Sequence, residues 1–599
     1  MRKILLITLI LSPLLASAQT DRELANEYFS SGDCEKAVVY GFKTLEQEFV
    51  RDILTRSVNC LIKEKKWAEA DAFFKKQLKK DEINQPFYHF QWGRVLLAQN
   101  KRPDAEARFQ STIDLISLRP DLYSLFIEEF RRIGEPDLAR KIVLSARERS
   151  RNANLFRLEL AGIFQELGDT ENMIRELLSY GSVIRNQDIV QNMLQDFLKS
   201  DKESELLEKI LYENIQKNPN EVFYNELLVW HQVQKKDFYK AFLQERSLDK
   251  RLKKNGSRII DLSRIALQNQ DYTNTLRMYD YLLKEYPKSE IYPYVKRMSI
   301  YVREEQTKRN YPVNLDEVRK LIADYESVLT ELGNDINALE AMRNMAMLYA
   351  FYLGDRKKSI ELLNQAISLA RNETSFADRC KLDLGDIYIL ENDPWEASLI
   401  YSQVEKSQKD NVLGYDAKLR NAKLYYYKGE FELAKSMLDI LKKATSREIA
   451  NDASALSLLI LDNTGLDSTD DAMKAYSSVE LLLFQHQYDK ALDSLGVLYE
   501  IYQDHSLADE IRWLQASTCI KLDRNQEAEK YLKEIIEKYD YDILGDNAVY
   551  QLAQLYETKL KNKEEAMRYY QMLLEKYPAS IYVADARKKY RILRGDILN

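Results

Sequence analysis

Glycine and proline are scarce in this chain, which contains 17 glycines and 11 prolines among 599 residues. An average protein contains about 7% glycine and about 5% proline. Glycine adds backbone freedom and proline removes a backbone donor, so both residues tend to mark the ends of regular elements. Because few residues interrupt a sequence rich in leucine, glutamate, lysine and alanine, we predict an almost entirely helical chain.

The chain also contains little of what metal and catalytic chemistry requires. Its four histidines, His89, His231, His486 and His505, are far apart and show no paired metal-binding spacing. No G-x-S-x-G, phosphate-binding loop or G-x-G-x-x-G motif occurs. We therefore predict that the protein is not an enzyme and has no metal site and no cofactor.

One acidic stretch, residues 462–471, invites interpretation as a calcium loop. Its glycine stands at the fourth position rather than the sixth, and no glutamate follows at the twelfth. An ordinary connection between two helices is the favoured interpretation.

Excess positive charge is absent as well. The formal net charge is −7, with lysine and arginine scattered along the chain, so we predict no nucleic-acid partner. With 31% charged and 45% hydrophobic residues the composition is that of an ordered protein. No window approaches the roughly 18 consecutive apolar residues of a membrane span, so we predict no direct membrane insertion.

The N-terminal segment, residues 1–18, has the pattern of a secretory signal peptide. Arg2 and Lys3 precede an apolar run over residues 4–15, and Ala16 and Ala18 form a small-x-small cleavage site. The run is too short for a transmembrane anchor, which needs about 20 apolar residues. No cysteine follows the cleavage site to accept a lipid. We expect an exported, soluble protein that begins at Gln19.

The remaining chain is organised around a pattern that is clearest in residues 552–578. The apolar residues recur at helical spacing in two segments, which a polar bend at residues 559–563 separates and Pro578 ends. Ala553 and Ala566 are expected to face each other across this helix pair. A single pair cannot bury its own apolar face, so copies must stack beside it.

The copies follow at a nearly constant period. The first small position of the second helix recurs at Ala37, Ala70, Ala105, Ala139, Met173, Leu207, Ala241 and Thr275. The successive differences in residue number are 33, 35, 34, 34, 34, 34 and 34. A period of about 34 residues that persists over seven intervals predicts an array of helix pairs.

This pattern resembles the tetratricopeptide repeat. The resemblance rests on the 34-residue period, on first helices such as Leu160/Ala161/Phe164, on Gly-Asp bends such as Gly168-Asp169, and on closing prolines such as Pro287. It implies an all-α fold, a tetratricopeptide-repeat superhelix (α-solenoid) of stacked antiparallel helix pairs. It also implies a concave groove that the first helices line.

The period breaks once and then resumes. We predict a signal peptide (1–18), an N-terminal array (19–288), an irregular helical junction (289–343), a C-terminal array (344–594) and a tail (595–599). In the C-terminal array the small position recurs at Ala397, Ala434, Ala491, Ala528 and Ala566, and the differences in residue number are 37, 57, 37 and 38. The long second interval predicts an extra helix over residues 447–461. Whether the junction is a hinge is left open.

The end of the last repeat, residues 577–586, resembles the endings of exported bacterial repeat proteins, which include the outer-membrane assembly lipoprotein and the Tol–Pal-associated cell-division coordinator. This resemblance implies a role in the cell envelope. Together with the repeat array, the signal peptide and the missing catalytic motifs, it predicts a non-enzymatic periplasmic scaffold for protein or peptide partners of the cell envelope. The alternative is a carbohydrate- or peptidoglycan-binding protein or a lytic enzyme built on a helical solenoid. The sequence leaves open the partner and the oligomeric state.

Large side chains occupy positions that, in the resembled family, face the groove. Phe87, Phe90, Arg94, Phe223 and Trp230 are therefore candidates for a partner-binding surface. The alternative is that irregular units rotate these side chains into the core.

Cys34 and Cys60 form a candidate disulfide. Cys34 begins the second helix of the first unit, and Cys60 lies late in the following helix, which runs antiparallel in the resembled family. The two positions are about one helical turn out of level, and bridging fails beyond a Cα separation of about 7 Å. The alternative is two independent core residues, as we assume for Cys380 and Cys519.

Overall fold

The computed structural model describes residues 20–198, 200–333, 335–370, 373–443, 446–464 and 470–594. The predicted signal peptide (1–18), the tail (595–599) and the centre of the acidic loop (465–469) lie outside the described residues. Contacts divide the chain into two compact units, one comprising Met1–Leu198 and Glu203–Asn214 and the other Lys199–Lys202 and Ile215–Asn599.

The first unit is built from short helices joined by tight turns. Its elements are α1 (Asp21–Ser31), α2 (Cys34–Gln47), α3 (Arg51–Lys63), α4 (Trp67–Lys80), α5 (Gln85–Ala98), α6 (Arg102–Ile116), the 3-10 turn η1 (Pro120–Leu122), α7 (Tyr123–Arg132), α8 (Pro136–Ser150), α9 (Arg157–Glu166), α10 (Thr170–Ile184), α11 (Gln187–Phe197) and most of α12 (Asp201–Lys217).

The second unit continues in the same way over more helices. They are α13 (Val222–Gln234), α14 (Phe238–Leu252), α15 (Ser257–Gln268), α16 (Tyr272–Glu285), α17 (Tyr292–Lys308), α18 (Leu315–Leu332), α19 (Ile336–Leu348), the π-helical η2 (Tyr349–Leu353), α20 (Arg356–Leu369), α21 (Thr374–Leu390), α22 (Pro394–Ser407), α23 (Val412–Tyr427), α24 (Phe431–Leu441), α25 (Arg447–Asp462), α26 (Asp471–Phe484), α27 (Tyr488–Tyr502), α28 (Ala508–Lys521), α29 (Asn525–Lys538), α30 (Gly545–Thr558), α31 (Lys563–Lys576) and α32 (Val583–Arg594).

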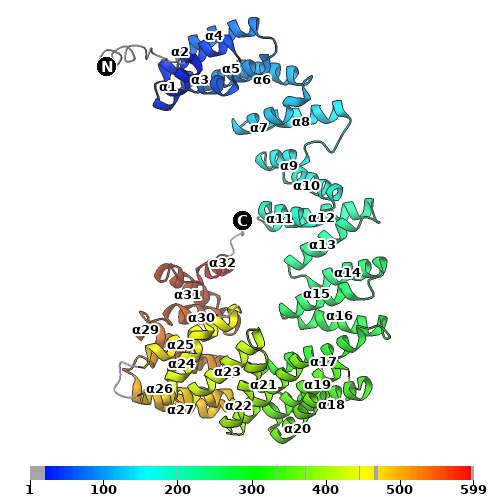
Figure 1. The fold of residues 1–599 in the computed structure, drawn as a ribbon, viewed down its shortest axis with the longest axis vertical. Helices are drawn as coiled ribbons and strands as arrows, with labels where there is room; N and C mark the ends of the chain where they lie inside the picture. Colours follow the sequence, from blue (N-terminus) through cyan, green and yellow to red (C-terminus); the bar gives the residue numbers. More distant parts are fainter. Residues whose placement is uncertain are drawn as a thin grey trace, which may run out of the picture. The chain divides into compact units, whose positions relative to one another are not determined.

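Within each unit the helices pack mainly on their neighbours in sequence. The pairs α1 and α2, α5 and α6, and α9 and α10 pack together in the first unit, and α22 and α23, α28 and α29, and α30 and α31 in the second. Figure 1 shows these successive helices, coloured along the sequence. The described residues contain helices and no strands. The predicted all-α solenoid of stacked helix pairs is confirmed.

The residues that revealed the period lie in the core. They fall on the second helix of a pair and are 0–2% exposed: Ala37, Ala70, Ala105, Ala139, Met173, Leu207, Ala241, Thr275, Ala397, Ala434, Ala491, Ala528 and Ala566. The alanine found here in most pairs lets the two helix backbones approach while larger residues fill the space around it. The same requirement in each pair explains the regular spacing.

Aspartates in the turns explain why the second helices begin where they do. Asp33 accepts a hydrogen bond from the backbone N–H of Lys36, and Asp169 accepts one from that of Asn172. Asp237, Asp271, Asp355 and Asp393 cap their helices in the same way. Each side chain satisfies a backbone donor that the helix itself leaves without a partner.

The segment where the period breaks is continuous with its neighbours. Residues 289–343 contain α17, α18 and the start of α19, and α17 packs on α16, α18 and α19. The break in the period reflects the long helices α17 and α18, with 17 and 18 residues. The boundary between the compact units lies elsewhere, near residues 199–215.

Candidate functional site

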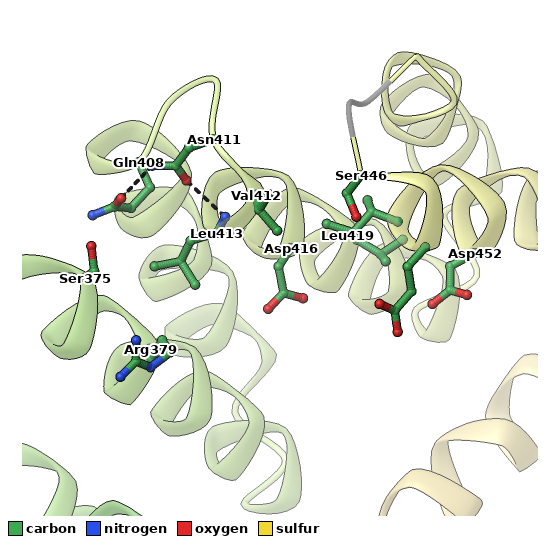
Figure 2. A pocket seen from close by; sticks show the side chains of 12 residues that line it. Ser375, Arg379, Gln408, Asn411, Val412, Leu413, Asp416, Leu419, Ser446 and Asp452 are labelled. Atoms are coloured by element: carbon green, nitrogen blue, oxygen red, sulfur yellow. Dashed lines mark hydrogen bonds between the residues drawn. The ribbon is translucent and has the colours of Figure 1, made fainter. Parts of the chain in front are cut away.

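The most informative surface lies where the extra helix interrupts the array. Helix α25 packs on α23 and α24, and a cavity of about 640 Å³ opens beside it. We call this cavity the α25 pocket. Its lining comes from α21, the α22–α23 turn, α23 and the beginning of α25: Ser375, Arg379, Gln408, Asn411, Val412, Leu413, Asp416, Leu419, Ser446, Glu448, Ile449 and Asp452 (Figure 2).

The α25 pocket has an apolar base. Leu419 and Ile449 belong to the core and contribute the side chains of α23 and α25. Leu413 is half-buried, whereas Val412 is 57% exposed at the first residue of α23. The exposed Val412, beside the half-buried Leu413 and the buried Leu419, provides apolar surface that a ligand can cover.

Carboxylates border this apolar base. Figure 2 shows Asp416 of α23 between Arg379 of α21, on the left, and Asp452 of α25, on the right. The Asp416 carboxylate forms an ion pair with Arg420, with a nitrogen–oxygen distance of 3.2 Å. The corresponding distance between Asp452 and Lys423 is longer, at 4.0 Å. Glu448 is exposed and forms no ion pair with any residue in the described part of the chain.

The one cation among these lining residues is already engaged. Arg379 forms an ion pair with Glu340 of α19, and its guanidinium lies 5.6 Å from the Phe376 ring centre. The pocket therefore presents negative charge beside apolar surface.

A hydrogen-bond network holds the α22–α23 turn in place. The Gln408 amide donates to Asp378 Oδ2 at 2.8 Å, and Asn411 donates to Gln408 Oε1 at 2.7 Å. Asn411 in turn caps α23 by accepting from the N–H groups of Leu413 and Gly414 at 2.9 and 3.1 Å. Figure 2 shows these contacts from Asn411.

Asp378 anchors this network from a buried position on α21. Burial alone would raise its pKa, but hydrogen bonds from Lys381, Ser407 and Gln408 outweigh that effect and lower the pKa. The close approach in this turn requires a glycine at position 414, because a Cβ atom there would lie 2.2 Å from the Gln408 carbonyl oxygen.

An ion-pair chain links the helices behind the α25 pocket. Arg420 of α23 forms ion pairs with Asp416 of the same helix and with Asp386 of α21. The Tyr401 hydroxyl donates a hydrogen bond to Asp386 at 2.6 Å. Burial raises the pKa of Asp386, although Arg420 and Tyr401 act in the opposite direction. This chain fixes Asp416 at the edge of the pocket.

The predicted groove residues of the first unit occupy different environments. Phe90 is 2% exposed and packs on the rings of Phe109, Phe126 and Phe130, so the expectation that it faces a groove is corrected. Its ring completes an aromatic core between neighbouring pairs. Phe87 is half-buried against Phe126.

Arg94, also half-buried, serves contacts within the first unit. It donates to Asn59 at 2.8 Å and to Gln91 at 2.7 Å. Burial lowers its pKa.

In the second unit, Phe223 is 5% exposed beside Tyr224, and its predicted groove position is corrected in the same way. Trp230 is half-buried, with its ring centre 6.5 Å from that of His231. The five candidates fall in two different compact units. A partner contact of Phe87, Arg94 and Trp230 stays a prediction.

Cys34 and Cys60 form a disulfide in the structure. Their Cα atoms are 5.2 Å apart, so α2 and α3 bring them closer than the antiparallel register suggested. Cys380 and Cys519 are buried without a disulfide. Burial raises the pKa of Cys380 to about 12 and that of Cys519 to about 11.

The residues of the α25 pocket were not singled out by sequence reasoning. A signal for them existed in the long interval between Ala434 and Ala491, because an inserted helix breaks the regular stacking and exposes side chains that a repeat would cover. In the described ranges, no group of histidine, cysteine, aspartate and glutamate side chains could hold a metal ion. None of the helices described there is long and apolar enough to cross a membrane.

The stacked pairs define an all-α repeat protein. More particularly, residues 547–580, which cover most of α30 and all of α31, match the tetratricopeptide repeat family. No curated protein sequence matches the chain.

Two solved structures are similar over long stretches. The structure of Naa15/Naa10 bound to HypK-THB has 13% identity, covers 96% of this chain and 97% of its own, and gives a TM-score of 0.29. A tetratricopeptide repeat protein from Parabacteroides merdae has 12% identity, covers 50% of this chain and 98% of its own, and gives a TM-score of 0.26. The fold assignment rests on the helix pairs of this chain rather than on these scores.

Proposed function

We propose that the protein is a non-enzymatic interaction scaffold whose α25 pocket binds a peptide segment carrying apolar side chains and a lysine or arginine. The observation that carries this proposal is the apolar base bordered by Asp416, Glu448 and Asp452. A lysine can lay its aliphatic stem on apolar surface and place its charge beside carboxylates. Partner choice then follows from charge complementarity.

The remaining helix pairs are, in this proposal, divergent tetratricopeptide repeats. Support comes from the buried small position that recurs in the second helix of most pairs. Family members act as platforms for protein partners, and an array of such pairs offers a long surface for them.

The proposal places the scaffold in the periplasm, with partners in the cell envelope. Support comes from the signal-like sequence of residues 1–18 and from the ending over residues 577–586. We expect the intact mass of the protein recovered from the periplasm to be that of a chain that begins at Gln19. Periplasmic protein that retains residues 1–18 would contradict this assignment.

Peptide binding tests the α25 pocket directly. We expect a fluorescein-labelled peptide of alternating lysine and leucine to bind, as measured by fluorescence anisotropy. The double substitution Glu448→Gln and Asp452→Asn should weaken binding about tenfold or more, because it removes the carboxylates that are least engaged within the protein. Val412→Ser should also weaken peptide binding, because it removes apolar surface from the pocket.

Matched controls separate the pocket from general charge effects. Glu527→Gln with Glu564→Gln removes the same charge from exposed first turns of α29 and α31. Val497→Ser changes a valine on α27 that is 62% exposed. If the controls weaken binding as much as the pocket variants do, the proposed site is wrong. Heat of binding measured when peptidoglycan fragments are titrated into the protein would favour the alternative of a carbohydrate-binding protein.

A further inference from the structure

A second cavity in the same unit forms where the ends of helices distant in sequence meet. Phe351 of η2 lies against His486, which precedes α27, with ring centres 5.1 Å apart. Tyr311, between α17 and α18, meets Tyr488 at the start of α27 with ring centres 6.1 Å apart. Gln485 donates to the carbonyl of Ile389 at 3.3 Å. Early and late helix pairs of the second unit are thus in direct contact.

The cavity at this contact measures about 670 Å³, and we call it the His486 cavity. Its aromatic and apolar lining comes from both sides of the contact: Tyr311, Val313, Leu315, Phe351, Tyr352, His486, Tyr488 and Ile520. Tyr311 is 39% exposed and Leu315 is 42% exposed. The size is that of a pocket for a small ligand or a few peptide side chains.

Cations outnumber anions in the lining of the His486 cavity. Lys308, Arg309, Lys521 and Lys559 contribute positive charges, and Asp523 contributes the one negative charge of the lining. Lys308 is neutralised by Glu304 and Glu305, and Lys559 pairs with Asp523 at 3.0 Å. These pairs account for two of the four cations.

The other two cations have no carboxylate partner in the described part of the chain. Lys521 lies 4.7 Å from the ring centre of Tyr488, and Arg309 lies 5.1 Å from that of Tyr272. Arg309, which follows α17, lies on the wall formed by the early helices, and Lys521, which ends α28, lies on the wall formed by the late helices. We call these the early wall and the late wall. Burial and the charge of Lys521 lower the pKa of His486, in keeping with a positive environment.

We propose that the His486 cavity binds an acidic peptide segment of a partner protein. Its carboxylates pair with Arg309 and Lys521, and an apolar side chain beside them covers Tyr311 and Leu315. Because the two cations come from opposite walls, the bound segment joins the early and late helix pairs. The charge of this ligand is opposite to that expected for the α25 pocket, so the chain has two sites with different preferences.

Anisotropy of a fluorescein-labelled peptide of alternating glutamate and leucine tests this site on the full chain. We expect Arg309→Gln with Lys521→Gln to weaken binding about tenfold or more. Lys530→Gln with Lys563→Gln removes two exposed cations outside the cavity and should leave binding unchanged. Equal loss in both double variants, or no loss in either, would overturn the proposal.

Three further measurements keep the test independent of folding and of the α25 pocket. Tyr311→Ser should also weaken binding, since it changes an exposed aromatic surface without changing charge. Hydrogen exchange should slow on both residues 308–315 and residues 485–488 when the peptide binds. Protection of one wall alone would refute the joining of the walls. Glu448→Gln with Asp452→Asn should leave this peptide bound, so a failure of the first proposal would not be mistaken for a failure of this one.

Discussion

At the scale of single residues, the second unit holds a carboxyl group among aromatic hydroxyls. Glu480 of α26 accepts a hydrogen bond from Tyr426 of α23 and lies close to Tyr427 and Tyr476. Burial raises its pKa more than the Tyr426 hydroxyl lowers it. The folded state therefore binds the proton of Glu480 more tightly than the unfolded state does.

Glu480→Gln should stabilise the protein at high pH. A raised folded-state pKa makes a contribution that is full below the unfolded value and is lost as the pH rises through the folded value. Glutamine keeps an acceptor for Tyr426 and carries no charge at any pH. We expect a higher melting temperature than wild type at pH 8 and little difference near pH 4.

The exposed Glu432 of α24 provides the control. Glu432→Gln should change neither melting temperature. A Glu480→Gln gain that is equal at both pH values would show that the titration of Glu480 is not its cause.

The disulfide provides a second prediction at this scale. Cys34→Ser with Cys60→Ser should destabilise α1–α3 by about 2–4 kcal/mol, because the bridge constrains the unfolded chain. Hydrogen exchange over these helices measures the loss. Wild type in reductant should match the variant, and the variant should not respond to reductant. Alkylation of the denatured, unreduced chain should label two thiols; labelling of all four would rule the bridge out.

At the scale of the element, stability depends on how closely two helices approach. Ala553 of α30 and Ala566 of α31 are fully buried, and the rings of Tyr556 and Tyr569 stack beside them with centres 5.6 Å apart. The α22–α23 turn also depends on a small residue, since Gly414 at the start of α23 leaves room for the Gln408 carbonyl.

Ala566→Trp should destabilise the last helix pairs by about 1–3 kcal/mol or more, because a large ring cannot fit where the helices meet. Faster hydrogen exchange in α30 and α31 would report this loss. Arg568→Trp places the same ring on an exposed position of α31 and should be tolerated. Similar behaviour of both variants would contradict the helix contact.

Gly414→Ala should disturb the α25 pocket in particular. The added Cβ would meet the backbone of Gln408 rather than a movable side chain, so the α22–α23 turn must shift. We expect this shift to disturb the Asn411 cap as well. We expect weaker binding of the lysine–leucine peptide together with lower stability. Unchanged peptide binding would show that the turn does not shape the pocket.

At the scale of the whole molecule, contacts between neighbouring pairs dominate within each unit. Stability in such arrays is close to a sum of local terms. A fragment of residues 19–288 should therefore fold and give a helical circular dichroism spectrum. A spectrum of mostly coil would refute additive stability between neighbours.

The sequence by itself determined the helix pairs and much of their detail. Ala37, Ala241 and Ala566 mark positions where backbones meet, and Asp33 and Asp169 mark where second helices begin. These features depend on residues within one pair or its neighbour. The helical spacing of apolar residues and the repeat period therefore contain the information needed to predict them.

The tertiary structure alone decided which large side chains are exposed and where cavities form. Phe90 became core because rings from the following helices close over it, and no single repeat specifies that rotation. The meeting of Tyr311 with Tyr488 joins segments with no local relation. Its cause is the small rotation from each pair to the next, accumulated over many pairs, which a local sequence pattern does not specify.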